Sequence, residues 1–202
     1  MKKILLIGSA VVLGCSLSHA TITGIPTWNY SGGLYCYNPV FDSTAQSVTL
    51  TGHQTDFGSI GLGINANSPS DPTLTINNSI NNQSSFVWTE YIVSVAMNQS
   101  FTINMASATA PAGWTASITQ PGAPVAGIYT GVIDYVGGTP VAIYPGANSI
   151  LDFGYQVTFS GSTSYSLTES ANPVPEPTIA AFLLISGTLL GGWMVARRRT
   201  AS

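Results

Sequence analysis

Positively charged residues are almost absent from this chain of 202 residues, which contains only five Lys and Arg residues. All five lie near the two ends, at Lys2, Lys3 and Arg197–Arg199, and none lies between them. Nucleic-acid binders neutralise phosphates with lysine and arginine, and phosphoryl-transfer sites commonly hold a cationic clamp. The composition therefore excludes nucleic acid as a partner and argues against nucleotide chemistry.

Side chains that carry out catalysis or redox chemistry are equally scarce. Of the two Cys and two His residues, Cys15 and His19 belong to residues 1–20, which leaves Cys36 and His53. A single cysteine cannot form an internal disulfide bond, so we expect Cys36 to be a small buried side chain or, alternatively, a thiol that joins two chains. Gly-x-Ser-x-Gly is absent, and neither remaining residue has the flanking sequence of a cysteine hydrolase. We expect no catalytic residue and no cofactor.

Metal-binding patterns are weak. His53 and Asp56 have a His-x-x-Asp spacing, which alone has no metal specificity, and a surface histidine is the favoured interpretation. Asn65, Asn67 and Asp71 offer oxygen ligands near one another, but they lack the dense acidic spacing and the final glutamate of a calcium-binding loop. We therefore expect no bound metal.

Residues 1–20 have the pattern of a secretory signal peptide. Two lysines precede the apolar stretch Ile4–Leu13, and a small-x-small sequence ends at Ala20. This pattern predicts signal cleavage between Ala20 and Thr21. A competing pattern that ends at Cys15 resembles a lipoprotein signal, in which the cysteine would be acylated.

The C-terminal part of the chain has the pattern of a membrane anchor. We expect residues 172–177 to be a linker and Thr178–Ala196, which contains no charged residue, to be a transmembrane helix. As a helix this run would be roughly 28 Å long, close to the hydrocarbon thickness of a bilayer. The tail 197–202 follows, and three basic residues in it would stop translocation and stay in the cytoplasm. These are Arg197, Arg198 and Arg199.

The same region resembles a known family of sorting signals. A Val-Pro-Glu-Pro motif precedes the apolar run and the arginine cluster, at Val174, Pro175, Glu176 and Pro177. In that order the three parts are similar to the PEP-CTERM sorting domain. The resemblance implies a transient partnership with an exosortase, a Gram-negative bacterium that makes exopolysaccharide, and a membrane-anchored precursor that ends at the cell surface or in the extracellular matrix.

Residues 21–171 are expected to form an all-β domain outside the cytoplasm. Period-two alternation is frequent, and no helical period is evident. The clearest alternation has apolar residues at Leu151, Phe153, Tyr155, Val157 and Phe159. Phe86–Ala96 and Val125–Val136 are apolar on both faces, which predicts strands that are covered on each side. Gly, Pro and Asn turns between the runs favour an antiparallel β-sandwich.

A looser resemblance concerns the topology of this domain. The order of Pro111–Trp114, Pro145–Gly146 and the alternating strand is similar to that in immunoglobulin-like bacterial surface domains. It favours an immunoglobulin-like sandwich over a jelly-roll type. Residues 21–45 could form an additional hairpin at the edge.

Four aromatic residues near the N-terminus form the main candidate binding site. They are Trp28, Tyr30, Tyr35 and Tyr37. Aromatic faces stack on sugar rings, so these residues could form a carbohydrate-binding edge. The favoured alternative is packing between two short strands of a hairpin that turns at Gly32-Gly33.

Glu90 and Asp134 lie in otherwise apolar segments. Two carboxyl groups suffice for glycoside hydrolysis, and burial would raise their pKa values. The favoured interpretation is a pair of solvent-facing or hydrogen-bonded strand residues. We therefore expect an exported, non-enzymatic surface or matrix protein associated with exopolysaccharide or a matrix protein, with a carbohydrate-binding module and, less favoured, a hydrolase as alternatives.

Overall fold

The computed structural model describes residues 20–104, 109–146 and 148–176. The predicted signal peptide up to residue 19, Pro177, the expected membrane helix 178–196 and the tail 197–202 lie outside these ranges. None of the described ranges contains a helix with the length and hydropathy needed to cross a bilayer.

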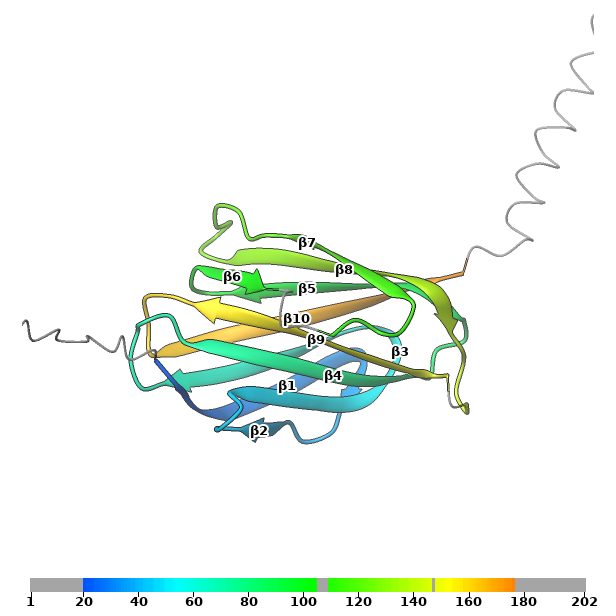
Figure 1. Cartoon of the computed structure of the whole chain (residues 1–202), viewed down its shortest axis with the longest axis horizontal. Helices are drawn as coiled ribbons and strands as arrows, with labels where there is room; N and C mark the ends of the chain where they lie inside the picture. Colours follow the sequence, from blue (N-terminus) through cyan, green and yellow to red (C-terminus); the bar gives the residue numbers. More distant parts are fainter. Residues whose placement is uncertain (1–19, 105–108, 147, 177–202) are drawn as a thin grey trace, which may run out of the picture.

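Ten β-strands make up the described residues, which confirms the all-β prediction (Figure 1). The strands are β1 (Ile22–Cys36), β2 (Val40–Asp42), β3 (Ser47–Ala66), β4 (Thr73–Asn82), β5 (Trp88–Met97), β6 (Phe101–Asn104), β7 (Trp114–Thr119), β8 (Tyr129–Val141), β9 (Ile150–Phe159) and β10 (Ser164–Pro175). They belong to one sheet with the order β6-β9-β4-β3-β10-β5-β8-β7, and β1 and β2 pair with β3 beside this path.

The long strand β3 makes the sheet curl. Its first half, Ser47–Gln54, pairs with β4, and its second half, Gly58–Asn65, pairs with β10. The pairing of β3 with β4 is parallel, which corrects the purely antiparallel sheet expected from the sequence. Parallel neighbours need a long crossover, and residues 55–72 supply it because the second half of β3 lies in the opposite wall of the sheet. Parallel strands are usually joined through a helix, and the sequence of residues 55–72 has no helical pattern that would have predicted a parallel pair.

The two walls of the curled sheet face each other across the core. β9 and β10 are not paired, yet the Tyr155 hydroxyl of β9 donates a hydrogen bond to Glu169 of β10 at 2.5 Å, and the Phe159 and Tyr165 ring centroids lie 4.7 Å apart. A chain of buried rings fills the centre: Trp88, Tyr91, Phe153 and Tyr135, with successive centroid separations of 5.4, 5.3 and 4.8 Å. The alternating apolar residues predicted for β9 all point into this core, which confirms the period-two reading of that segment.

The two ends of the sheet come close enough to give a near-barrel. Beyond β7, the Gln120 side chain reaches β6: its Oε1 accepts a hydrogen bond from the Ile103 N–H at 2.9 Å, and its Nε2 donates to the Ile103 carbonyl at 2.7 Å. This amide satisfies both backbone groups of Ile103, as a neighbouring strand would.

The expectation that Val125–Val136 is covered on both faces is wrong. Val136 is 48% exposed, and Val125 is 79% exposed and precedes β8. The inward face of this segment is buried at Ile133 and Tyr135, whereas no second layer of described residues covers the outward face. A run that is apolar on both faces therefore marks one covered face and one partly exposed apolar face here.

β10 is longer than expected: it extends to Pro175, whereas the sequence predicted that the domain ends at residue 171. Val174 pairs with Glu90 and Pro175 with Trp88 of β5, and the Glu176 N–H donates to the Val87 carbonyl at 3.0 Å. The first residues of the expected linker 172–177 thus belong to the sheet. At the other end of the domain's long axis, the Ala20 N–H donates to the Ser70 carbonyl at 3.2 Å, and the Thr21 N–H donates to Asn67 Oδ1 at 2.9 Å (Figure 1).

Candidate functional site

The four aromatic residues singled out in the sequence are all exposed. Trp28, Tyr30, Tyr35 and Tyr37 have exposed fractions of 37, 44, 45 and 62%. The favoured interpretation, that they pack within a hairpin core, is therefore wrong. Large aromatic side chains that stay exposed together are a feature of interaction surfaces.

These rings contact one another in a continuous series that also includes His53. We call Trp28, Tyr30, Tyr35, His53 and Tyr37 the aromatic ladder. Successive centroid separations are 6.1 Å from Trp28 to Tyr30, 5.7 Å from Tyr30 to Tyr35, 5.0 Å from Tyr35 to His53 and 6.3 Å from His53 to Tyr37. The structure thus brings all four predicted residues together and adds His53, which the sequence pattern did not assign to them.

A kink in β1 makes the ladder continuous. In a regular strand, residues 30 and 35 would point to opposite faces, because side chains alternate with a period of two. Here Gly32 has a φ of 68°, and the pairing with β3 shifts register between Gly32 and Leu34. The expected hairpin turn at Gly32-Gly33 is therefore wrong: β1 continues through it as one strand. A glycine pair inside an alternating aromatic run was the available signal for this bulge.

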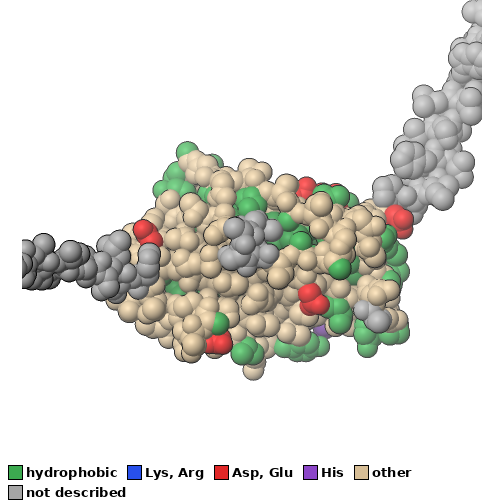
Figure 2. Space-filling view, in the orientation of Figure 1, with side chains coloured by type: hydrophobic (Ala, Val, Ile, Leu, Met, Phe, Trp, Pro, Cys, Tyr) green, Lys and Arg blue, Asp and Glu red, His purple; other side chains and the backbone are tan. Residues whose placement is uncertain are grey.

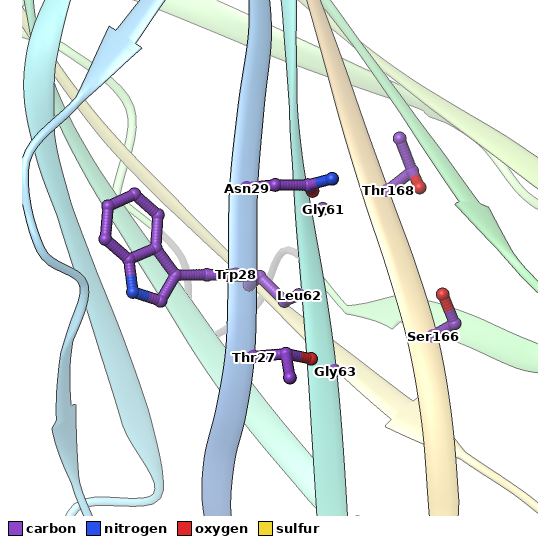
Figure 3. Close-up of a pocket in the computed structure, with 8 residues that line it drawn as sticks. All are labelled: Thr27, Trp28, Asn29, Gly61, Leu62, Gly63, Ser166 and Thr168. Carbon is purple, nitrogen blue, oxygen red and sulfur yellow. The ribbon is translucent and has the colours of Figure 1, made fainter.

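A shallow groove of about 430 Å³ begins beside Trp28 (Figure 3). Its floor is formed by β3 at Gly61 and Gly63. The Thr27 and Asn29 side chains of β1 point across this floor toward β10, whereas the Trp28 ring points the other way (Figure 3).

On the far side of the groove, Ser166 and Thr168 of β10 form the second wall. No motif in the sequence identified these two residues. The Gly-x-Gly repeat within β3 was the one signal for a close approach there.

The ladder and the groove contain no Lys, Arg, Asp or Glu side chain. Lys and Arg are absent from the described residues, and the face shown in Figure 2 carries a few separate acidic groups. The groups on offer are aromatic rings, hydroxyls and amides. They can stack and form hydrogen bonds with a neutral ligand.

Glu90 and Asp134 lie on the neighbouring strands β5 and β8, a pairing the sequence could not establish. Burial, followed by the nearby Asp134 carboxyl group and its hydrogen bond, raises the pKa of Glu90. Glycosidases hold their two carboxyl groups roughly 5–9.5 Å apart, on either side of the scissile bond. Here Glu90 lies opposite Val136 and Asp134 lies opposite Ile92, so the two carboxyl groups are diagonal neighbours on adjacent strands.

Cys36 is buried and unpaired, as expected of a small core residue. Burial, with a smaller effect of Glu169, raises the pKa of its thiol to about 11, so the reactive thiolate is disfavoured. His53 stacks on Tyr35, and within the described ranges no group of three or more His, Cys, Asp or Glu side chains is placed to hold a metal ion.

The residues considered as calcium ligands do not share a loop: Asn65 lies within β3, and Asn67 Oδ1 accepts a hydrogen bond from the Thr21 N–H at 2.9 Å.

Compared with known proteins, the chain matches no family model, no curated protein and no solved structure.

Proposed function

We propose that this chain is an exported, non-enzymatic protein of the cell surface or extracellular matrix that binds exopolysaccharide through its aromatic ladder. The observation that supports this best is the contact between four exposed aromatic side chains and His53. The sorting signal would bring the protein to the polymer, and the ladder would hold it there.

Stacking on sugars suits this ladder for a physical reason. Aromatic faces attract the polarised C–H groups of a sugar ring, and stacking removes apolar surface from water. Tyr and Trp side chains lose little conformational entropy on binding because they have two χ angles. Contacts between neighbouring rings restrain them further, so part of the ordering cost precedes binding.

Charge selects among the polymers that such a site could bind. The chain has a formal net charge of −3, and the described domain contains no Lys or Arg. An acidic polysaccharide would be repelled, whereas a neutral one would not. We therefore propose a neutral exopolysaccharide as the partner, or a matrix protein that carries neutral glycans.

The route to this destination belongs to the same proposal. A signal peptide ending at Ala20 would export the chain of a Gram-negative bacterium, and a helix at 178–196 would anchor it until an exosortase acts near Val174–Pro177. The finer description of the domain, as an immunoglobulin-like or jelly-roll-type sandwich, is also proposed, because β9 and β10 face each other across the core without pairing.

Processing by an exosortase predicts a defined C-terminus. Because β10 is hydrogen-bonded to β5 as far as Pro175, a protease that needs free extended backbone should cut at Glu176 or beyond. Mass spectrometry of the C-terminal peptide from native cells should find this new end, and cells without the exosortase should retain Ser202. An intact Ser202 in both strains would contradict the sorting proposal.

Binding through the ladder predicts a loss of affinity in alanine variants. Trp28→Ala and Tyr35→Ala should each weaken retention on the exopolysaccharide about five-fold, since an aromatic contact contributes about 1 kcal/mol. Affinity electrophoresis against the purified polymer measures this change. Tyr144→Ala is the matched control because Tyr144 is 52% exposed and outside the ladder. Equal retention of all three folded variants would rule out the ladder as the binding site.

A further inference from the structure

The groove beside Trp28 continues across the sheet. A second hollow of about 300 Å³ adjoins it, and Ser166 and Thr168 line both. The second hollow extends over β5 at Ala96 to Ile128, which is 43% exposed. We call the two hollows together the cross-strand trough. It passes from β1 over β3 and β10 to β5.

Glycines keep the first part of the trough low. A Cβ atom at Gly61 would lie 2.4 Å from Asn29 Oδ1, and one at Gly63 would lie 2.3 Å from Thr27 Oγ1. Such contacts are impossible without movement, so the two glycines allow the side chains of β1 to lie flat over β3. Larger residues would push Asn29 and Thr27 up into the space that a ligand would occupy.

Polar side chains along the trough are not engaged within the protein. Thr27, Asn29, Ser166 and Thr168 line it, and their side chains form no hydrogen bond with another described residue. By contrast, the neighbouring hydroxyl groups of Ser31 and Ser59 bond to each other at 2.8 Å. Hydroxyl and amide groups that face one trough without protein partners are available to a ligand rich in hydroxyl groups.

We propose that the cross-strand trough binds an internal segment of a linear, neutral polysaccharide, which lies across the strands as far as the edge strand β1. The aromatic ladder begins with Trp28 on the opposite face of that strand (Figure 3). This inference rests on the proposed function and specifies its ligand. Strand spacing makes the path from β1 to β5 about 14 Å long, which suits several sugar units in succession. The lining contains no charged side chain, which favours a neutral chain.

Three hydroxyl-bearing residues on β10 provide a test of the trough with a matched control. Ser166→Ala combined with Thr168→Val removes two hydroxyl groups from the trough without breaking a hydrogen bond inside the described protein. Ser170→Ala removes one from the same outward face of β10 but outside the trough. The ligands are oligosaccharides of six and two sugar units, prepared by hydrolysis of the neutral exopolysaccharide of the producing bacterium. Isothermal titration calorimetry measures their binding to the full-length chain in detergent.

The double variant should bind the hexamer about ten-fold or more weakly, since a hydrogen bond contributes about five-fold. It should lose much less affinity for the dimer, and Ser170→Ala should behave as wild type. Gly61→Ser, which displaces a flexible asparagine, should reproduce the loss for the hexamer.

The outcomes separate the two proposals. If Trp28→Ala weakens hexamer binding and the double variant does not, the ladder binds the glycan and the trough inference is wrong. Equal losses for dimer and hexamer would make the trough a site for one or two sugars and would contradict a chain lying across the strands. If the wild-type chain binds neither hexamer nor intact polymer, the proposed function itself fails.

Discussion

Replacing Trp88 with alanine should lower the free energy of unfolding by about 3–5 kcal/mol, the usual cost of removing a buried tryptophan. The Trp88 side chain is fully buried, and its ring packs on Tyr91 at 5.4 Å. Its Nε1 also donates to Ser84 Oγ at 3.0 Å, so the substitution leaves a cavity and removes a hydrogen bond from a buried hydroxyl. Urea denaturation followed by circular dichroism measures the change.

Trp28→Ala is the matched control for this experiment. Trp28 is 37% exposed and lies in the aromatic ladder, so its loss should cost far less stability while it weakens glycan binding. The two tryptophans should thus separate stability from binding. Similar losses of stability in both variants would contradict the assignment of Trp88 to the core and Trp28 to the surface.

Glu169 should make the domain less stable as pH rises through the mildly acidic range. Its carboxyl group is 2% exposed, and it accepts hydrogen bonds from Tyr155 Oη at 2.5 Å and Asn78 Nδ2 at 3.3 Å. No Lys or Arg is present among the described residues to neutralise it. Burial raises the pKa of Glu169, although the two hydrogen bonds act in the opposite direction.

The direction of the pH effect follows from proton binding. Between the ordinary glutamate pKa of about 4.3 and the raised pKa of the native state, the folded chain holds a proton that the unfolded chain has released. Stability is therefore greatest below the unfolded pKa and declines as pH rises toward the folded one. Thermal unfolding measured across this range should show the decline.

Glu169→Gln removes the buried charge and keeps the shape of the side chain. At pH 7 it should raise the free energy of unfolding by about 1–3 kcal/mol, the cost of an incompletely compensated buried polar group, and it should flatten the acid-range slope. Asp152→Asn removes an exposed charge from β9 and should leave the slope unchanged. A Glu169→Gln variant with the wild-type slope would show that another group causes the pH dependence.

The candidate site was only partly predictable. Alternation of aromatic residues identified Trp28, Tyr30, Tyr35 and Tyr37, but it favoured the wrong environment for them. Exposure depends on what covers a strand, and β1, which carries three of these rings and ends just before Tyr37, lies beside the main path of the sheet and pairs with β3 alone. The sequence also could not place His53 among these rings, because its position beside Tyr35 depends on the register between β1 and β3.

The sequence by itself determined those features that depend only on residues close together in the chain or on overall composition. The period-two pattern of β9 follows from the geometry of a single strand, so it predicted the inward residues from Leu151 to Phe159. The all-β class followed from the same pattern and from Gly, Pro and Asn turns. The lack of positive charge is a property of composition and holds for any fold.

Contacts between residues far apart in the chain were determined only by the tertiary structure. The bend of β3 pairs one half with β4 and the other half with β10, and this places Glu169 against Tyr155 and opens the trough over Gly61. Strand register, bulges and coiling set these contacts, and they depend on the packing of the whole sheet. A pattern within one segment cannot carry that information, because the partner strand lies elsewhere in the chain.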